Sequence, residues 1–186
     1  MIDQTPDIIA FDIATTTGWA RGRVGTTPSS GSKRFGTVEA SPGAVFKHAM
    51  EWFEETLTNA APPSIVVWEA LLPPTAKQGE TQAHVRDRLA GLHAIVLGTA
   101  HRFGIYQTAI YQVADIRQHF IGHRNLKTVK AKRAVVERCR ALGWPCESDD
   151  AGDALAAWHF ACSLIDPAQA LKVSPLFNKQ LRVHVQ

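Results

Sequence analysis

The sequence has few cysteines and no long apolar run. Its three cysteines, Cys139, Cys146 and Cys162, are odd in number and have neither a Cys-x-x-Cys pair nor a Cys/His spacing typical of zinc. This argues against a disulfide framework or a zinc site and is typical of a reduced protein. A polar, acidic stretch precedes the first apolar segment, and no apolar run approaches the roughly 20 residues that span a bilayer. We therefore expect a cytoplasmic protein that is not in a membrane.

Length and composition predict one folded unit. The chain has 186 residues, of which 45% are hydrophobic, enough for one core. We expect one domain over residues 1–166 and a C-terminal tail over 167–186.

Acidic residues follow two apolar segments that have the character of buried strands. Asp12 lies within the run from Asp7 to Ile13, and Glu69 ends the run that begins at Ser64. A charged carboxylate in a buried strand is costly unless it is paired, protonated or bound to metal. Asp12 could instead cap the Thr-rich turn that follows it, and Glu69 could simply be solvated. We consider both to be candidate metal ligands.

Two further acids lie near the start of an apolar helix predicted over residues 150–165. Asp150 and Asp153 are three residues apart and therefore share a helix face. A helix N-terminus favours negative charge, so Asp149 or Asp150 could serve only as a cap, but a cap does not explain Asp153. Four carboxylates gathered at one end of a sheet would suit two divalent ions and phosphodiester cleavage.

The remaining segments predict an α/β fold. The first strand is followed by two more, over 18–24 and 33–39, with a Gly/Ser/Thr/Pro-rich loop over 25–32, which makes an antiparallel meander. Helices are expected from about 41 to before Pro62, from 81 to 103 and from 127 to 142, with strands ending at Glu69 and spanning 105–113.

The three acidic segments together resemble the RuvC family of Holliday-junction resolvases, within the ribonuclease-H-like superfamily. The resemblance covers roughly residues 7–163 and lies in Phe-Asp12-Ile-Ala-Thr-Thr-Thr-Gly-Trp, Val-Val-Trp-Glu69 and Asp150-Ala-Gly-Asp153-Ala-Leu-Ala. It implies a mixed sheet flanked by helices, with the four acids holding two Mg²⁺ ions, or Mn²⁺ in their place. It also implies a homodimer that cuts branched DNA. Resolvases of this family often have an aromatic residue shortly after the Glu, whereas this chain has Ala70-Leu-Leu-Pro-Pro74.

Basic residues are concentrated in one part of the chain. Between Asp115 and Arg140, eight Lys and Arg side chains face two acidic ones, so this segment carries +6 although the whole chain carries +3. A basic segment beside an acidic cluster suits a protein that binds DNA phosphates, although it could also be a solvated helix face. The predicted DNA-binding residues are Arg117, Arg124, Lys127, Lys130 and Arg133.

Lys132 differs from the other cations because its helical spacing places it among apolar neighbours. It would either extend to the edge of the core or act near the scissile phosphate, and Lys130 is a close rival for the second role. His119 and His123 are expected in a basic loop, where phosphate contact or surface exposure is favoured over proton transfer.

Two other functions remain open. The turn after Asp12 also resembles the phosphate-binding turn of actin-like ATPases and sugar kinases, which need two such domains, more than this length provides. The other alternative is a non-catalytic DNA-binding protein of the same fold, against which the intact acids argue.

Overall fold

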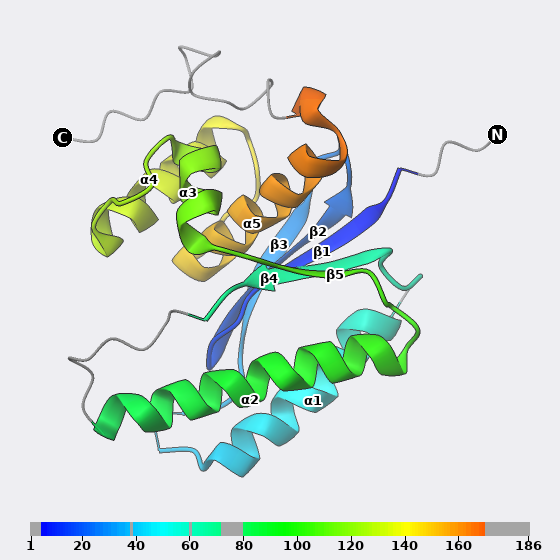
Figure 1. The fold of residues 1–186 in the computed structure, drawn as a ribbon, viewed down its shortest axis with the longest axis vertical. Helices are drawn as coiled ribbons and strands as arrows, with labels where there is room; N and C mark the ends of the chain where they lie inside the picture. Colours follow the sequence, from blue (N-terminus) through cyan, green and yellow to red (C-terminus); the bar gives the residue numbers. More distant parts are fainter. Residues whose placement is uncertain (1–4, 38, 60, 72–79, 170–186) are drawn as a thin grey trace.

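The computed structural model describes residues 5–37, 39–59, 61–71 and 80–169. A five-stranded mixed sheet lies between two layers of helices (Figure 1) and has the order β3-β2-β1-β4-β5. The strands are β1 (Asp7–Asp12), β2 (Thr16–Arg23), β3 (Ser29–Arg34), β4 (Ile65–Glu69) and β5 (Thr108–Tyr111). None of the described helices is both long and apolar enough to cross a bilayer.

The pairing of the strands confirms the expected combination of a meander with parallel strands. β1 pairs antiparallel with β2, and β2 pairs antiparallel with β3. β1 also pairs parallel with β4, which pairs parallel with β5. The expected position of the third strand was wrong, because β3 begins at Ser29, inside the segment assigned to the loop, and ends at Arg34. The Gly25 backbone has a φ of 87°, so the chain reverses early and β2 pairs directly with Ser29.

β1 is covered on both faces, which explains its continuous apolar run. Ile8 and Ala10 belong to one hydrophobic core, and Ile9 and Phe11 belong to the other. Successive side chains of a strand point to opposite faces of a sheet, so one strand supplies both cores.

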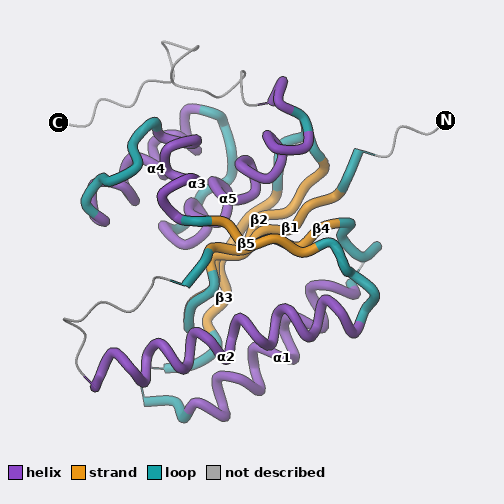
Figure 2. Tube along the Cα trace, in the orientation of Figure 1, coloured by secondary structure: helices purple, strands orange, loops and turns teal. Residues whose placement is uncertain are grey.

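The helices divide between the two faces of the sheet (Figure 2). α1 (Pro42–Thr58) and α2 (Glu80–Arg102) cover one face, while α3 (Val113–Ile121), α4 (Thr128–Ala141) and α5 (Asp149–Ile165) cover the other. The start of α1 follows from its sequence: the Ser41 hydroxyl accepts a hydrogen bond from the Ala44 amide, and Pro42 fills the first helical turn.

α3 replaces the end of the strand and the loop that the sequence analysis assigned to residues 105–123. The strand β5 ends at Tyr111, and Gly122 ends the helix with a φ of 75°. Ile116 and Phe120 fall at helical spacing and are buried, which is the signal that the prediction of a loop overlooked.

α5 packs closely on the sheet because its buried face is built from small residues. Ala151, Gly152, Ala154 and Ala157 are all buried. Leu155 and Trp158 provide the bulk on the same helix. Of the predicted tail, residues 170–186 lie outside the described residues.

Candidate active site

Asp12 and Glu69 end two neighbouring strands at the same level of the sheet. β1 and β4 run parallel, and Phe11 is paired in register with Trp68. The next residue on each strand is the acid, so the two carboxylates emerge side by side at the carboxyl edge of the sheet. Ligands of open α/β sheets bind at this edge.

Asp150 and Asp153 approach Asp12 from the start of α5, which lies across β1 and β2. Gly18 of β2 is paired with Asp12, and a Cβ atom built on Gly18 would lie 1.9 Å from the Asp150 carbonyl oxygen. Only a glycine lets the helix come this close. Ser148 caps the helix by accepting from the Ala151 amide, so neither Asp149 nor Asp150 is the N-cap residue.

Lys132 points from α4 toward the acids on α5. Its Nζ lies 3.6 Å from Asp150 Oδ1 and 3.9 Å from Asp153 Oδ2. Burial disfavours the charged lysine, but Asp153, Asp150, Asp12 and Asp149 outweigh it and raise the pKa of Lys132. The lysine therefore stays charged beside the carboxylates.

The electrostatics show that the acids form one interacting group. Burial, followed by the charges of Asp153 and Asp150, raises the pKa of Asp12 to about 7. Burial, followed by the charge of Asp12, raises the pKa of Glu69 well above its ordinary value. Burial is also the main reason that the pKa of Asp153 rises to about 6. Carboxylates that repel one another in a buried site favour the binding of a cation, because its charge relieves the repulsion.

Arg117 is the second cation of this group. Its charge lowers the pKa values of Asp12, Glu69 and Asp153, although burial and repulsion dominate at each acid. Arg117 was predicted only as a DNA-binding residue, and its position beside the acids was not predicted. Arg117 lies beside the acids because it is on α3. In the loop that was expected here, the direction of its side chain could not be predicted.

The four acids suit a divalent metal in their chemistry. All four are carboxylates, the ligands that Mg²⁺ and Mn²⁺ prefer, and burial together with mutual repulsion raises the pKa values of Asp12, Glu69 and Asp153, which a bound cation would counter. Within the described part of the chain, however, no three His, Cys, Asp or Glu side chains converge closely enough to hold one ion between them. Here the Lys132 ammonium group lies against Asp150 and Asp153.

The other predicted DNA-binding residues lie on or near α4. Arg124 pairs with Asp115 at 2.8 Å, and Arg133 pairs with Glu137 at 2.8 Å. Lys127 and Lys130 are exposed at the start of α4. A groove of about 490 Å³ runs along α4 from Thr128 to Arg140 and reaches Asp149, and Lys132 and Arg133 line it. Basic side chains therefore line a path that leads to the acids.

The two histidines occupy different surroundings. His123 is exposed after α3, as expected, but the loop position predicted for His119 was wrong. His119 lies on α3, where its Nε2 is 2.8 Å from His159 Nδ1 and the two rings stack at 5.0 Å. Burial lowers the pKa of His119 to about 4, so it is neutral at physiological pH.

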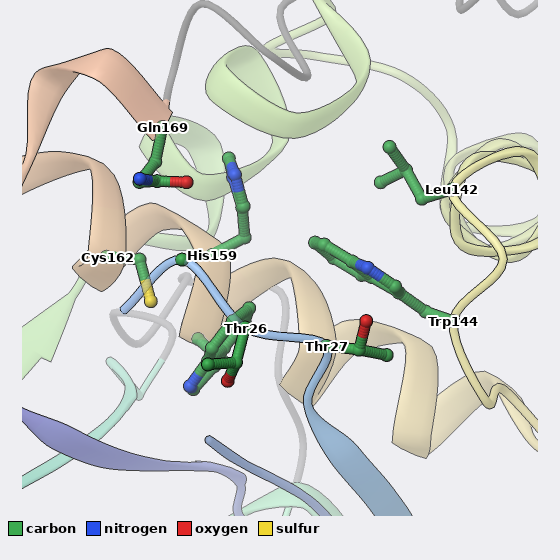
Figure 3. Close-up of a pocket in the computed structure, with 9 residues that line it drawn as sticks. Thr26, Thr27, Leu142, Trp144, His159, Cys162 and Gln169 are labelled. Atoms are coloured by element: carbon green, nitrogen blue, oxygen red, sulfur yellow. The ribbon is translucent and has the colours of Figure 1, made fainter. Parts of the chain in front are cut away.

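A second cavity lies at the opposite end of α5 from Asp150. Figure 3 shows Trp144, His159 and Cys162 around it, with Thr26 and Thr27 contributed by the turn between β2 and β3. Its volume is about 210 Å³. Because α5 begins at the acids and this turn lies at the other edge of the sheet, the cavity is separate from the acidic cluster.

Solved structures share this fold, although no family model and no curated protein sequence matches the chain. RuvC from Thermus thermophilus matches with a TM-score of 0.62 and 15% identity, over 86% of this chain and 95% of RuvC. The same protein in complex with a Holliday junction substrate matches with a TM-score of 0.64, 15% identity and the same coverage, 86% and 95%.

The yeast mitochondrial Holliday junction resolvase Ydc2 matches with a TM-score of 0.56 and 10% identity, over 94% of this chain and 84% of Ydc2. The structural matches establish the fold. At identities this low they do not establish the activity, which must be argued from the site. The chain has the RuvC type of ribonuclease-H-like fold, as its three acidic segments predicted.

Proposed function

We propose that this protein is a metal-dependent endonuclease that cleaves branched DNA, with the Holliday junction as its preferred substrate. The observation that carries the proposal is the convergence of Asp12, Glu69, Asp150 and Asp153 on one sheet edge, where burial and mutual repulsion raise the pKa values of Asp12, Glu69 and Asp153. Burying these charges does not improve the packing of the core, and buried charges are costly, so a functional role explains them better.

These four carboxylates would hold two Mg²⁺ ions, or Mn²⁺. Bound ions of this kind activate water for attack on a phosphodiester and stabilise the charge that develops on the leaving oxygen. The side chains of Asp150 and Asp153 would turn from Lys132 toward the ions. Asp12 and Glu69 come from rigid strand ends, so their positions are fixed before substrate binds.

Lys132 and Arg117 would orient the scissile phosphate. Both lie beside the acids, and the side chain of Lys132 is only about one-third exposed. Once ions neutralise the acids, Lys132 becomes available to donate to a phosphate oxygen. A cation that binds charge developing in the transition state accelerates cleavage more than it strengthens binding.

The groove along α4 would bind the DNA backbone away from the cleavage point. Lys127, Lys130 and Arg133 lie on or beside it, and Arg124 lies on the loop that leads to it. Contacts with phosphates position the duplex without reading its sequence. We expect binding that depends strongly on salt.

A homodimer in the cytoplasm completes the proposal. Two symmetry-related sites would cut opposite strands of a junction, which has approximate twofold symmetry itself. We place the dimer face on α2, which is long and exposes Val85, with 54% of the surface of this residue accessible.

The test is cleavage of a panel of labelled DNAs: a four-way junction, a three-way junction, a flap and a linear duplex, each with Mg²⁺. We expect the four-way junction to be cut fastest and the linear duplex to be left intact. Calorimetry with ATP and Mg²⁺ distinguishes the actin-like alternative. Tight ATP binding without DNA cleavage would overturn the proposal, and junction binding without cleavage in Mg²⁺ or Mn²⁺ would favour a non-catalytic DNA-binding protein.

A further inference from the structure

Two of the three cysteines meet where α4 ends. Gly143 has a φ of 70°, which reverses the chain, and the Trp144 amide donates a hydrogen bond to the Cys139 carbonyl at 3.0 Å. This turn brings Cys146 back against the helix that carries Cys139. Both cysteines belong to the core between α4, α5 and the sheet, Cys139 as a buried member and Cys146 packed at its edge.

The turn places the Cys146 thiol against the segment of α4 that carries Cys139. A Cβ atom built on Gly152 would lie 3.3 Å from both Cys146 Sγ and Val135 Cγ1, and Val135 is one helical turn before Cys139. In this arrangement a hydrogen bond from the Cys139 thiol to the sulfur of Cys146 accounts for the electrostatics of the pair. That hydrogen bond is the main reason that the pKa of Cys146 is lowered, against the effect of burial, and Arg140 adds to the lowering. Cys146 is half-buried and Cys139 is fully buried, so an oxidant in solution reaches Cys146 first.

Cys162 provides an internal comparison. It is buried on α5 and lines the cavity in Figure 3, and burial raises its pKa to about 12. Among the described residues, no other cysteine influences the pKa of Cys162, and its side chain is less accessible than that of Cys146.

We propose that Cys139 and Cys146 form a disulfide when the protein meets a peroxide. The Cys146 thiolate attacks one oxygen of hydrogen peroxide, which gives a sulfenic acid and, after protonation, one water. The Cys139 sulfur then displaces the hydroxyl group of the sulfenic acid, its proton leaves with that group as a second water, and the S–S bond forms. In sum, two thiols lose two hydrogens and the peroxide is reduced to two waters.

The bond would act on the start of α5, and this consequence depends on the proposed nuclease function. The Cys146 thiol donates to the Ser148 carbonyl at 3.6 Å, and Ser148 is the N-cap residue of α5. α4 carries Lys132, and α5 carries Asp150 and Asp153. A disulfide draws the Cys146 sulfur toward α4 and removes its bond to Ser148, so the acids shift against Lys132. A misplacement of this kind slows cleavage about tenfold or more.

The chemical test uses the folded full-length protein treated with hydrogen peroxide and then with a thiol-alkylating reagent. We expect a mass loss of two hydrogens and one alkylatable thiol after denaturation. Trypsin cleaves after Arg138 and Arg140, so the bond would hold the dipeptide Cys139-Arg140 to the peptide 141–172. That peptide also contains Cys162, so the assignment is made in Cys162→Ala.

The matched variants decide the pairing. Cys146→Ser and Cys139→Ala should lose the linked peptides, whereas Cys162→Ala should keep them. If Cys162→Ala abolishes the linkage, or if the wild type keeps three alkylatable thiols, the proposed pair is wrong.

The functional readout is junction cleavage before oxidation, after oxidation and after reduction with dithiothreitol. We expect loss and recovery in the wild type and no loss in Cys146→Ser. A disulfide that forms without changing cleavage would overturn the regulatory role. An inactive reduced protein would count against the proposed function alone, because the thiol measurement does not require nuclease activity.

Discussion

The two faces of the sheet are packed in different ways. On the α1/α2 face, the rings of Phe11 and Phe53 meet at 5.1 Å, and Trp52 packs against both Phe11 and Phe35. On the α3/α4/α5 face, small residues of α5 lie against the sheet, with the acids at its first turns. Aromatic rings fill the first face throughout. On the second face, rings such as Phe120 and Trp158 fill the core farther from the acids, and the start of α5 brings its backbone against β2.

The difference assigns separate tasks to the two layers. Large aromatic contacts give stability that does not depend on one close approach. Close contact between helix and sheet places Asp150 and Asp153 beside Asp12, at the cost of burying charges that repel. We therefore expect stability to depend most on the α1/α2 face and cleavage to depend most on the other.

Phe53→Ala should cause the largest loss of stability. Phe53 is fully buried among aromatic rings, and removing such a side chain costs about 3–5 kcal/mol. Urea unfolding measures the loss. Met50→Ala on the same helix is the control, because Met50 is 48% exposed. If the fraction of Phe53→Ala that remains folded cleaves junctions far more slowly than the wild type, the two faces do not have separate tasks.

Gly18→Ala should damage both stability and cleavage. The added methyl group meets the Asp150 carbonyl at 1.9 Å, so α5 must move away from β2, which costs about 1–3 kcal/mol. Gly43→Ala is the control, because nothing lies within 4 Å of its Cβ position. Unfolding and junction cleavage are measured on both variants, and normal cleavage by Gly18→Ala would refute the close-approach argument.

Asp12→Asn should stabilise the metal-free protein at high pH. The pKa of Asp12 is raised from 3.8 to about 7, so its stabilising contribution is complete below 3.8 and is lost as pH rises toward about 7. The substitution removes this loss, so its gain should be absent below about pH 4, grow between about pH 4 and 7, and reach a few kcal/mol near pH 8, since one pKa unit corresponds to about 1.4 kcal/mol.

Unfolding in EDTA at several pH values measures this effect. Glu55→Gln, an exposed change on α1, serves as the control. Parallel pH profiles for Asp12→Asn and the wild type would show that neither burial nor repulsion raises the pKa of Asp12 in the folded state.

Lys130→Ala and Lys132→Ala should have the smallest effects on stability and should separate binding from catalysis. Lys130 is exposed, so its removal should lower the slope of log affinity against log salt by about 0.9 and leave the single-turnover rate near that of the wild type. Lys132 faces the acids, so its removal should reduce the rate more than the affinity. Equal effects of both substitutions on both quantities would remove the distinction.

The sequence predicted the fold where patterns were local and strong. Apolar runs ending in Asp12 and Glu69 predicted β1 and β4, and proline and apolar spacing predicted α1. It misplaced β3, because the strand is rich in Ser and exposed and owes its form to pairing with β2. α3 was missed because nine residues hold too few turns for a clear period, and the position of Arg117 was missed with it.

The site itself was predictable in part. Helical spacing predicted that Lys132 points inward, and the structure places it at Asp150 and Asp153. Helical spacing alone does not show burial, because Val129, one turn before Lys132 on the same helix, is 82% exposed, and the buried residues of α4 begin at Ala131. The contact between Cys139 and Cys146 depends on the left-handed turn at Gly143, which spacing along the chain does not show.

The most direct test of the central claim is single-turnover cleavage of a four-way junction by Asp12→Asn and Asp153→Asn at saturating Mg²⁺, with junction affinity measured in Ca²⁺ beside it. If the acids hold the metal and the α4 groove holds the DNA, both variants should lose cleavage by about a thousandfold or more and keep affinity within about threefold of the wild type. Cleavage at the wild-type rate by either variant would contradict the account.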